Sequence, residues 1–159
     1  MNRVVFKTAI ALALLVSAST HVFAAECPKD QVTKGAFLPG ETKPKGVTDT
    51  VLSAIDISAK GDAFKGYMLR MRKLVVEPGG VVPFHKHDVR ASNILILEGE
   101  ITEYSTTCKI QLNHKAGDVT AEFGADVAHW WRNNSKKRAV IIAADLLPPM
   151  MAPEEQKKM

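Results

Sequence analysis

The sequence lacks the dense basic stripe and the known modules by which nucleic-acid-binding proteins are recognised. Its formal charge is +4, but Arg3 and Lys7 contribute to this charge from the first residues of the chain. Its lysine pairs, Lys136-Lys137 and Lys157-Lys158, are typical of a turn and a chain end. We therefore expect no nucleic acid among the partners of this protein.

A hydrophobic run long enough to span a membrane is also missing. The apolar run near the start covers about residues 8–16, well short of the roughly 20 residues that a bilayer core requires. Arg3 and Lys7 precede it and small residues follow it, which is the pattern of a cleaved secretory signal. We expect residues 1–24 to be such a signal, the mature form to have no membrane span, and the protein to be periplasmic or secreted.

Cysteine is scarce, and both cysteines, Cys27 and Cys108, lie after the predicted signal. In an exported protein such an even number favours a disulfide, because the compartment is oxidising. Closing a loop of about 80 residues would stabilise the fold by roughly 4 kcal/mol in the chain-entropy treatment. We expect this bridge, with two free thiols as the alternative.

Beyond the signal, the chain shows no long helical pattern and no internal repeat of useful length. Short segments rich in β-branched and apolar residues alternate with turn signals such as "EPGG", "HKAGD" and "NNSKK". This pattern predicts an all-β sandwich or barrel. We expect an extended arm over residues 25–46, one barrel over residues 47–148 and a flexible tail over residues 149–159.

One predicted strand, "NILILEG", is apolar on both faces. Ile94 and Ile96 share one face, and Leu95 and Leu97 share the other. A strand with one wet face should alternate, so we expect burial on both sides. One face would line the barrel, and the N-terminal arm, a sheet edge or a partner subunit would cover the other. A homodimer is therefore a hypothesis.

Alternation also assigns faces to other strand segments. Tyr67, Leu69 and Met71 share one face, which we expect to line the barrel or pack in its core. Trp131 shares a face with His129, which favours core packing, with a pocket wall as the alternative.

Histidines are the first sign of a functional site. Because side chains alternate along a strand, His85 and His87 point the same way, roughly 6–7 Å apart. The pair enters an apolar strand, where two buried imidazoles need partners, and His129 lies in another strand-like segment, "HWWRN". These three histidines are candidate metal ligands. His114 lies in the turn segment "NHKAGD" without such a partner, and we expect it to be an ordinary core or surface residue.

The spacing around the histidine pair matches a known motif. Gly79 is followed after five residues by His85 and His87, after four more by Ser92, and after six more by Gly99. The first motif of the cupins, a family of double-stranded jelly-roll barrels, has the same spacing with a glutamate in place of Ser92. The chain therefore resembles a small single-domain cupin in which this one residue is replaced.

A second stretch is similar to the second cupin motif. It opens at Gly117 and closes with His129 and Asn133, which have the three-residue gap of that motif. Residues 124–126, "GAD", replace its Pro-x-Gly turn. The resemblance covers about residues 67–147, and it implies a cupin jelly-roll barrel that takes a small-molecule ligand or substrate.

The resemblance also implies a metal site. His85, His87 and His129 match three of the four usual cupin ligands, whereas Ser92 takes the fourth position and is a poor ligand for a divalent ion. Glu122, near the loop before His129, is our candidate for a substitute carboxylate. The cofactor would be one divalent transition metal, and ligand type alone leaves Fe, Zn, Mn, Cu and Ni open.

Three neutral imidazoles leave open positions on the ion and its full 2+ charge, which favours an anionic or chelating substrate. Arg90 could pair with a substrate carboxylate and Trp131 could wall the pocket, although Arg90 could equally be a solvated loop residue. Some cupin-like dioxygenases use three histidines on iron, so the resemblance implies metal-dependent oxidation of a small oxygenated or carboxylated molecule. The alternative is a non-catalytic barrel that binds a small ligand and whose metal site is degraded.

Overall fold

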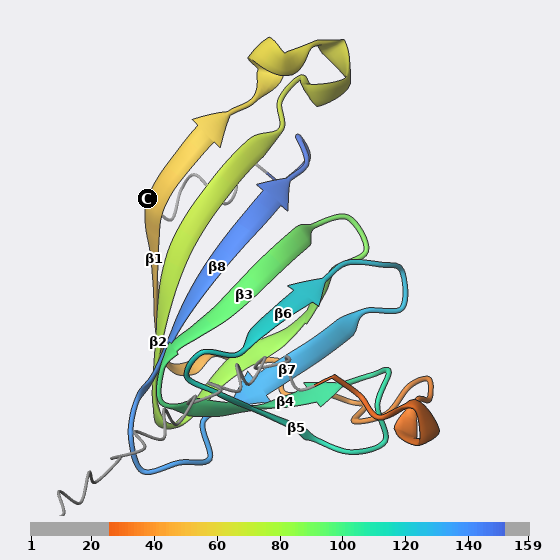
Figure 1. Ribbon diagram of the computed structural model, residues 1–159, viewed down its shortest axis with the longest axis vertical. Helices are drawn as coiled ribbons and strands as arrows, with labels where there is room; N and C mark the ends of the chain where they lie inside the picture. Colours follow the sequence, from red (N-terminus) through yellow and green to blue (C-terminus); the bar gives the residue numbers. More distant parts are fainter. Residues whose placement is uncertain (1–25, 152–159) are drawn as a thin grey trace, which may run out of the picture.

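Strands make up most of the backbone in the computed structural model, which describes residues 26–151 (Figure 1). The strands are β1 Lys45–Asp56, β2 Met68–Lys86, β3 Ala91–Glu98, β4 Glu100–Ser105, β5 Leu112–Lys115, β6 Val119–Glu122, β7 Ala128–Arg132 and β8 Ala139–Leu147. The short 3₁₀ helices are η1 Lys29–Gln31, η2 Ser58–Lys60 and η3 Asp62–Phe64. None of the helices within residues 26–151 is long and apolar enough to cross a membrane. The predicted signal and residues 152–159 of the predicted tail lie outside the described residues.

The strands form one antiparallel sheet that curls over on itself, as Figure 1 shows. Its order is β5-β4-β7-β2-β8-β3-β6, and β1 pairs with β2 beside this path. Strand β2 connects the two sides of the curled sheet, because its first half pairs with β1 and β8 and its second half pairs with β7. The predicted all-β jelly-roll barrel is confirmed.

Strand β2 passes without a break through residues 77–80, the "EPGG" segment for which the sequence predicts a turn. Gly79 has a positive φ of 73°, a conformation that a residue without a side chain adopts at little cost. The backbone stays paired there, because Gly79 N–H donates to Asn133 O at 2.8 Å and Asn133 N–H donates to Gly80 O at 3.0 Å. The predicted break is therefore wrong: the glycines bend the strand and do not end it.

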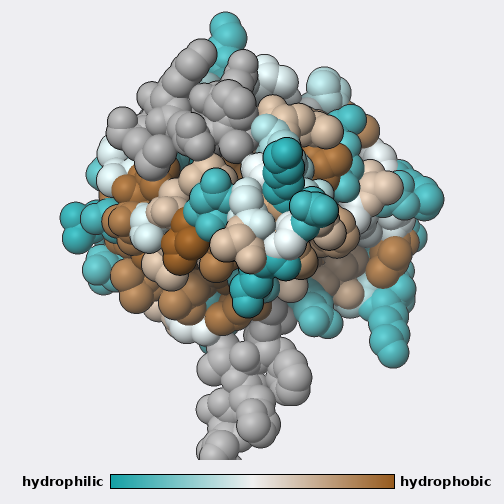
Figure 2. Space-filling model, turned by 90° about the horizontal axis from the view of Figure 1, so that it is seen from above, coloured by the Kyte–Doolittle hydropathy of each residue, from teal (hydrophilic) through white to brown (hydrophobic). Residues whose placement is uncertain are grey.

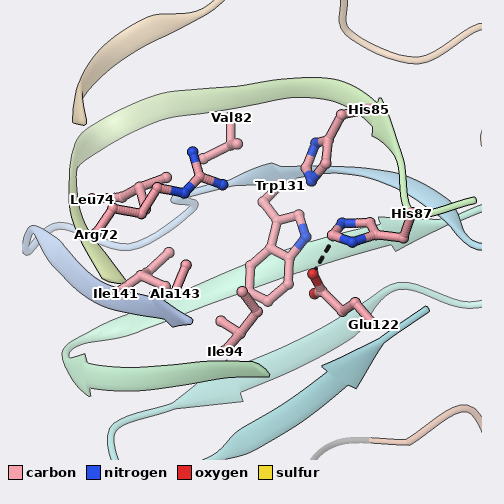
Figure 3. Close-up of a pocket in the computed structure, with 10 residues that line it drawn as sticks. All are labelled: Arg72, Leu74, Val82, His85, His87, Ile94, Glu122, Trp131, Ile141 and Ala143. Atoms are coloured by element: carbon pink, nitrogen blue, oxygen red, sulfur yellow. Dashed lines mark ion pairs between the residues drawn. The ribbon is translucent and has the colours of Figure 1, made fainter. Parts of the chain in front are cut away.

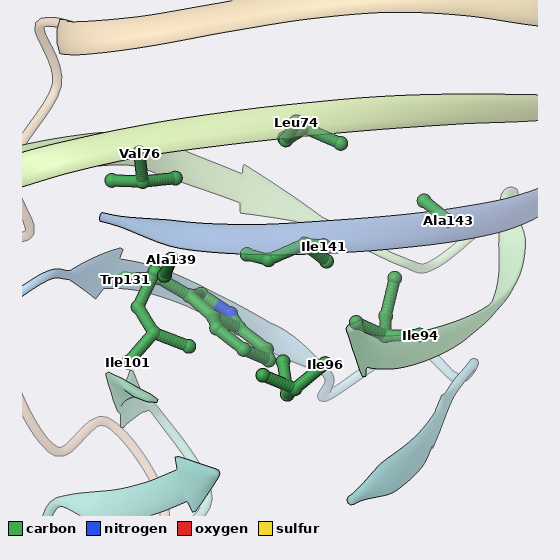
Figure 4. Close-up of a cluster of buried hydrophobic side chains, with 9 residues drawn as sticks. All are labelled: Leu74, Val76, Ile94, Ile96, Ile101, Trp131, Ala139, Ile141 and Ala143. Carbon is green, nitrogen blue, oxygen red and sulfur yellow. The ribbon is translucent and has the colours of Figure 1, made fainter. Parts of the chain in front are cut away.

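The hydrophobic core fills the inside of the curled sheet (Figure 4). Its members are aliphatic or aromatic side chains from β2, β3, β4, β7 and β8: Leu74, Val76, Ile94, Ile96, Ile101, Trp131, Ala139, Ile141 and Ala143. Burying one large aliphatic side chain stabilises a fold by about 1.5–3 kcal/mol. Because Ile96 is 1% exposed, we expect its truncation to alanine to destabilise the barrel by about 2–5 kcal/mol.

Strand β3 is buried on one face only within the described chain. Ile94 and Ile96 lie in the core, but Leu97 on the opposite face is 50% exposed. The expectation of burial on both sides is therefore wrong for residues 26–151 taken alone. Figure 2 shows hydrophobic side chains gathered side by side on one face of the molecule. Large exposed apolar patches are rare on monomeric proteins, so a partner subunit stays a prediction.

In the first half of β2 the apolar side chains point outward, whereas the sequence pattern predicts that they face the inside of the barrel. Leu69 and Met71 are 46% and 45% exposed, whereas Arg70 between them is 3% exposed. Arg70 points inward because it meets Asp145, its cross-strand partner on β8. The prediction that Leu69 and Met71 line the barrel is wrong, and charged side chains occupy that inner surface.

The N-terminal arm lies against the loop that follows β4. Thr33 N–H donates to Thr107 O at 3.0 Å, and Val32 forms an isolated β-bridge with Cys108. Cys27 forms a disulfide with Cys108, with an S–S distance of 2.06 Å. The disulfide expected from the sequence is thus present, and it ties the arm to the barrel.

Candidate metal centre

Three histidines meet inside the barrel. His85 lies near the end of β2 and His87 directly after that strand, while His129 lies on neighbouring β7 as the cross-strand partner of His85. The Nε2 atom of His129 lies 3.1 Å from that of His85 and 3.2 Å from that of His87. The two-residue spacing and the register of β7 therefore bring the three predicted ligands together.

Each of these rings is held by its other nitrogen. The Nδ1 atoms of His85 and His87 lie 2.8 Å and 3.1 Å from backbone carbonyl oxygens, and His129 Nδ1 lies 2.7 Å from Glu103 Oε1. Carbonyl and carboxylate oxygens only accept hydrogen bonds, so each Nδ1 carries a proton and donates it. In the neutral rings each Nε2 is then an unprotonated lone pair, which is the tautomer of a metal ligand.

The spacing of these lone pairs fits a shared cation. Neighbouring ligand atoms about 2.0–2.2 Å from one transition ion stand roughly 2.8–3.6 Å apart in octahedral or tetrahedral geometry. The Nε2 separations of 3.1 Å and 3.2 Å fall within that range. Lone pairs brought this close repel one another unless a proton or a metal ion lies between them. The residues therefore fit a metal ion by geometry as well as by donor type.

A carboxylate completes the group. Glu122, at the end of β6, is the direct cross-strand partner of Ser92 on β3, so both side chains point to the inner face. Its Oε2 lies 3.1 Å from His87 Nε2 and 3.7 Å from His129 Nε2, and Figure 3 shows it facing His87. All four ligand atoms lie within 4.8 Å of one another, in a group that could hold a metal ion: His85, His87, Glu122 and His129.

Ser92 itself serves a buried ionic network. Its hydroxyl donates to Asp145 Oδ1 at 2.6 Å, and Arg70 Nη2 donates to Oδ2 of the same carboxylate at 2.6 Å. Burial opposes ionisation of Asp145, but the charge of Arg72 and the hydrogen bonds from Ser92 and Arg70 lower its pKa. Asp145 is therefore an anion inside the barrel, and the hydroxyl at the motif position stabilises it.

Burial controls the charge of the histidine group. Burial, reinforced by the charge on His129, lowers the pKa of His85 to about 2 and the pKa of His87 to about 4. Burial would also lower the pKa of His129, but its hydrogen bond to Glu103 and the charge of Glu122 raise it. Burial raises the pKa of Glu122 to about 7. Among the three histidines, His129 is therefore the one whose surroundings favour the protonated form, and a metal ion would replace the proton on its Nε2.

A buried glutamate behind His129 is the main feature that the sequence analysis missed. Glu103 on β4 accepts from His129 Nδ1 at 2.7 Å and from His114 Nε2 at 2.9 Å. Burial would raise the pKa of Glu103, but the hydrogen bonds from these two histidines lower it to about 2. A carboxylate in this position fixes the tautomer of a metal-binding histidine and raises its basicity. The feature of the sequence that could have indicated this role is a charged residue, Glu103, in the middle of the strand segment "EITEYS".

His114 lies in β5 and not in the turn where the sequence analysis placed it. The turn begins later, because Lys115 N–H donates to the Asp118 carboxylate at 2.8 Å. The ring is 1% exposed and stacks on Trp131 with the ring centroids 4.8 Å apart. The expectation of a core residue is confirmed, and the ring also bonds Glu103, which links it to His129.

A cavity of about 30 Å³ lies beside the histidines, with room for about two water molecules. Figure 3 shows its lining residues, which combine apolar walls with charged ends: Arg72, Leu74, Val82, His85, His87, Ile94, Glu122, Trp131, Ile141 and Ala143. Trp131 is 4% exposed and belongs both to the core and to the cavity wall.

Arg90 is buried just before β3 and is not one of the residues that line this cavity. Its backbone carbonyl accepts from His87 Nδ1 at 3.1 Å. Its charge adds to the burial that lowers the pKa of both His85 and His87. Arg90 therefore orients the candidate ligand His87 through its backbone carbonyl, while its contact with a substrate stays a prediction.

Comparison with solved structures identifies the class of fold. The Cnp3 cupin domain of Schizosaccharomyces pombe superposes with a TM-score of 0.51 at 10% identity, over 71% of this chain and 69% of that one. A Cupin 2 conserved barrel domain protein from Salinispora arenicola CNS-205 gives 0.49 at 15% identity, over 71% and 85%. An oxalate oxidase in complex with the substrate analogue glycolate gives 0.48 at 19% identity, over 65% and 52%. No protein-family model and no curated protein matches the sequence.

The fold is therefore that of a cupin, a double-stranded β-helix closed into a jelly-roll barrel. At identities below 20% the likeness concerns the fold alone. Within this fold, Glu122 lies beside His85, His87 and His129 in a group that could hold a metal ion.

Proposed function

We propose that this chain is an exported cupin that binds one divalent transition metal through His85, His87, His129 and Glu122. We infer further that it is a metal-dependent oxidoreductase, dioxygenase-like in type, acting on a small oxygenated or carboxylated molecule. The observation that carries the proposal is the convergence of three Nε2 atoms and one carboxylate oxygen within 4.8 Å.

This donor set suits an ion that keeps open positions. Four protein ligands leave two positions of a six-coordinate ion for water and substrate. When bound, the ion would supply Lewis acidity and, in the case of iron, manganese or copper, redox chemistry. Glu103 holds His129 in the binding tautomer, and the apolar wall that includes Trp131 limits the water that reaches the site.

Export is supported by the signal-like pattern of residues 1–24 and by the two cysteines. A disulfide such as Cys27–Cys108 persists in oxidising compartments and is rare in the cytosol. The proposed location is accordingly periplasmic or secreted.

A homodimer is supported by the outer face of the sheet. Leu69, Met71, Val119 and Phe123 come from strands β2 and β6 and the segment after β6, and all are 45–65% exposed. Leu69 and Phe123 line one groove on this face together with Ala144 and Leu146 of β8. Covering these side chains with a second copy would remove apolar surface from water, which favours association.

The alternative function, a non-catalytic ligand-binding barrel with a degraded metal site, rests on Ser92 in the motif. Its support is weaker because Glu122, the cross-strand partner of Ser92, brings a carboxylate to the same histidines. The cavity of about 30 Å³ is compatible with both functions.

Oxygen consumption distinguishes the two functions. Protein loaded separately with Fe, Mn, Cu, Ni or Zn would be mixed with small hydroxy, oxo and carboxylic acids while dissolved oxygen is recorded. We expect uptake with a redox-active ion, its loss in His87→Ala, and its retention in Lys86→Ala, because Lys86 is exposed beside the same histidines. Ligand binding without oxygen uptake, for every metal, would establish the non-catalytic alternative.

A further inference from the structure

The wall of the cavity beside the histidines contains a hydrogen-bond donor, the indole of Trp131. This side chain is 4% exposed and lines the cavity, and its Nε1–H can only donate. No hydrogen bond from this atom to another group within residues 26–151 is found, and the printed contacts of the ring are with the rings of His114 and His129. Because the N–H of a buried tryptophan usually has a partner, a ligand in the cavity has a donor to bind.

An acceptor without a partner lies beside this donor. Glu122 Oε2 lies 3.1 Å from His87 Nε2, whereas Glu122 Oε1 is buried and has no hydrogen-bond partner within the described part of the chain. Figure 3 shows the indole nitrogen of Trp131 pointing toward His87, with the Glu122 carboxylate on the same side of the indole ring. Both residues line the cavity, so one donor and one acceptor face the same space.

The donor is held in one position by its neighbours. The Trp131 ring stacks on His114 with the ring centroids 4.8 Å apart, and His114 Nε2 in turn donates to Glu103 at 2.9 Å. The ring of His129 meets Trp131 edge-on with the centroids 5.5 Å apart. A donor that is fixed before a ligand arrives loses little conformational freedom on binding.

Size and charge restrict the ligand that this space can take. The cavity of about 30 Å³ has room for about two water molecules, so an enclosed ligand has about two non-hydrogen atoms. Charged side chains of both signs already lie around the histidines: Arg72, Arg90, Glu103, Glu122 and Asp145. A neutral ligand leaves their balance unchanged, whereas an ion would add a buried charge.

We propose that the cavity binds hydrogen peroxide, a neutral molecule with two oxygen atoms that both donates and accepts hydrogen bonds. One oxygen accepts from Trp131 Nε1, and a hydroxyl donates to Glu122 Oε1. The assignment rests on the proposed metal-binding function and names its small oxygenated molecule, because an ion on Oε2 keeps Glu122 a carboxylate, whose Oε1 only accepts. Dioxygen has no proton for that atom, and an alkyl hydroperoxide exceeds the volume of the cavity.

The indole proton of Trp131 reports binding directly in zinc-loaded protein, since zinc carries no redox chemistry. The chain has two tryptophans, so its ¹H–¹⁵N spectrum has two indole signals, which Trp130→Phe assigns. We expect hydrogen peroxide to move the Trp131 signal downfield in a saturable manner, and tert-butyl hydroperoxide, with the same O–O–H group on a larger body, to leave it in place. Mass spectra of the same samples exclude methionine sulfoxide as a cause. No shift with hydrogen peroxide, or equal shifts with both probes, would overturn the assignment.

A matched pair of variants locates the binding at Trp131. In calorimetric titrations with hydrogen peroxide, Trp131→Phe should retain one equivalent of zinc and bind the probe about 2–10-fold more weakly, which is the effect of one neutral hydrogen bond. Trp130→Phe is the control and should bind like the wild type, because Trp130 stacks on Tyr104 and does not line the cavity. Undiminished binding in zinc-loaded Trp131→Phe would overturn the assignment. The indole spectrum of the wild type decides the question if Trp131→Phe does not fold.

The zinc content of the wild-type protein tells two failures apart. If the protein takes up no zinc, the metal-binding function itself fails and the peroxide assignment falls with it. If zinc is bound and hydrogen peroxide leaves the Trp131 signal in place, the metal-binding function stands and only the peroxide site is refuted.

Discussion

Ser92 and Glu122 are direct cross-strand partners in the β3–β6 ladder. Side chains of such a pair point to the same face with their Cβ atoms about 4.5–5.5 Å apart. Glu122 therefore brings a carboxylate of β6 to the histidines from the position paired with Ser92, with its Oε2 3.1 Å from His87 Nε2. Ser92 binds Asp145 at 2.6 Å, so the two members of this pair serve different groups: Glu122 faces the histidines and Ser92 the buried ionic network of Asp145.

The first prediction concerns the origin of this carboxylate. Glu122→Ala should weaken metal binding by at least roughly 100-fold, because a charged ligand oxygen is lost. Ser92→Glu in the same chain should restore part of the affinity, since the new side chain starts from the paired position on the same face. Competition with a coloured chelator measures both changes.

Ser92→Ala is the control for that experiment. It removes the hydrogen bond to Asp145, which should destabilise the fold by about 1.5–3 kcal/mol, and it should leave metal affinity unchanged. Wild-type affinity in Glu122→Ala would show that Glu122 is not a ligand.

The second prediction concerns Glu103, which touches His129 and no other member of the metal group within residues 26–151. Glu103→Gln should lower metal affinity by about 10–100-fold with all four proposed ligands intact, because the amide no longer holds His129 as firmly or raises its basicity. The rate of metal loss to a chelator, followed over a pH series, is the measurement. His114→Phe keeps the contact with Trp131 and should give a smaller loss; an unchanged rate in Glu103→Gln would contradict this role.

The third prediction is a pH dependence of the metal-free protein. The pKa of Glu122 is raised from 4.5 to about 7, so between these values the folded state binds more protons than the unfolded state and stability falls as the pH rises. Relative to Glu122→Gln, the wild-type free energy of unfolding should drop by up to about 3 kcal/mol between pH 4.5 and 7. Urea unfolding of both proteins in the presence of a chelator measures this difference, and a difference independent of pH would refute the shift.

The fourth prediction concerns the exposed face of the sheet. If a second copy covers it, light scattering of the wild type should give twice the mass of one chain. Leu69→Lys/Phe123→Lys should give one chain mass, because both side chains line the same outer groove. Ile110→Lys changes a residue that is 43% exposed in the loop between β4 and β5, and should remain dimeric. A wild-type mass equal to that of one chain would refute the homodimer hypothesis.

Local rules predict much of the fold from this sequence. The spacing of short apolar segments indicates the barrel, and the His-x-His pair with His129 indicates three members of the metal group. These features depend on strand alternation, which is a property of neighbouring residues. The prediction of a break at residues 77–80 is wrong because backbone pairing with Asn133 continues through the bend.

Other parts of the site depend on register between strands, which the sequence does not display. Glu103 and His114 lie on β4 and β5, and their relation to His129 follows from the pairing of β4 with β7. The sequence does not predict that Arg72 lies on the inner face of β2. Alternation from the apolar residues Leu69 and Met71 predicts instead that the opposite face is buried. Long-range charge pairing with Asp145 decides that strand face, and the pattern of apolar residues does not.

The most direct test of the account is the metal content of protein isolated without a metal-binding tag or chelators. Elemental analysis would be run on the wild type, on His85→Ala/His87→Ala and on the exposed control Lys86→Ala. The account predicts near one equivalent of a transition metal in the wild type and in the control, and its loss in the double variant. Absence of metal from the wild type, even after addition of iron, zinc, manganese, copper or nickel, would contradict it.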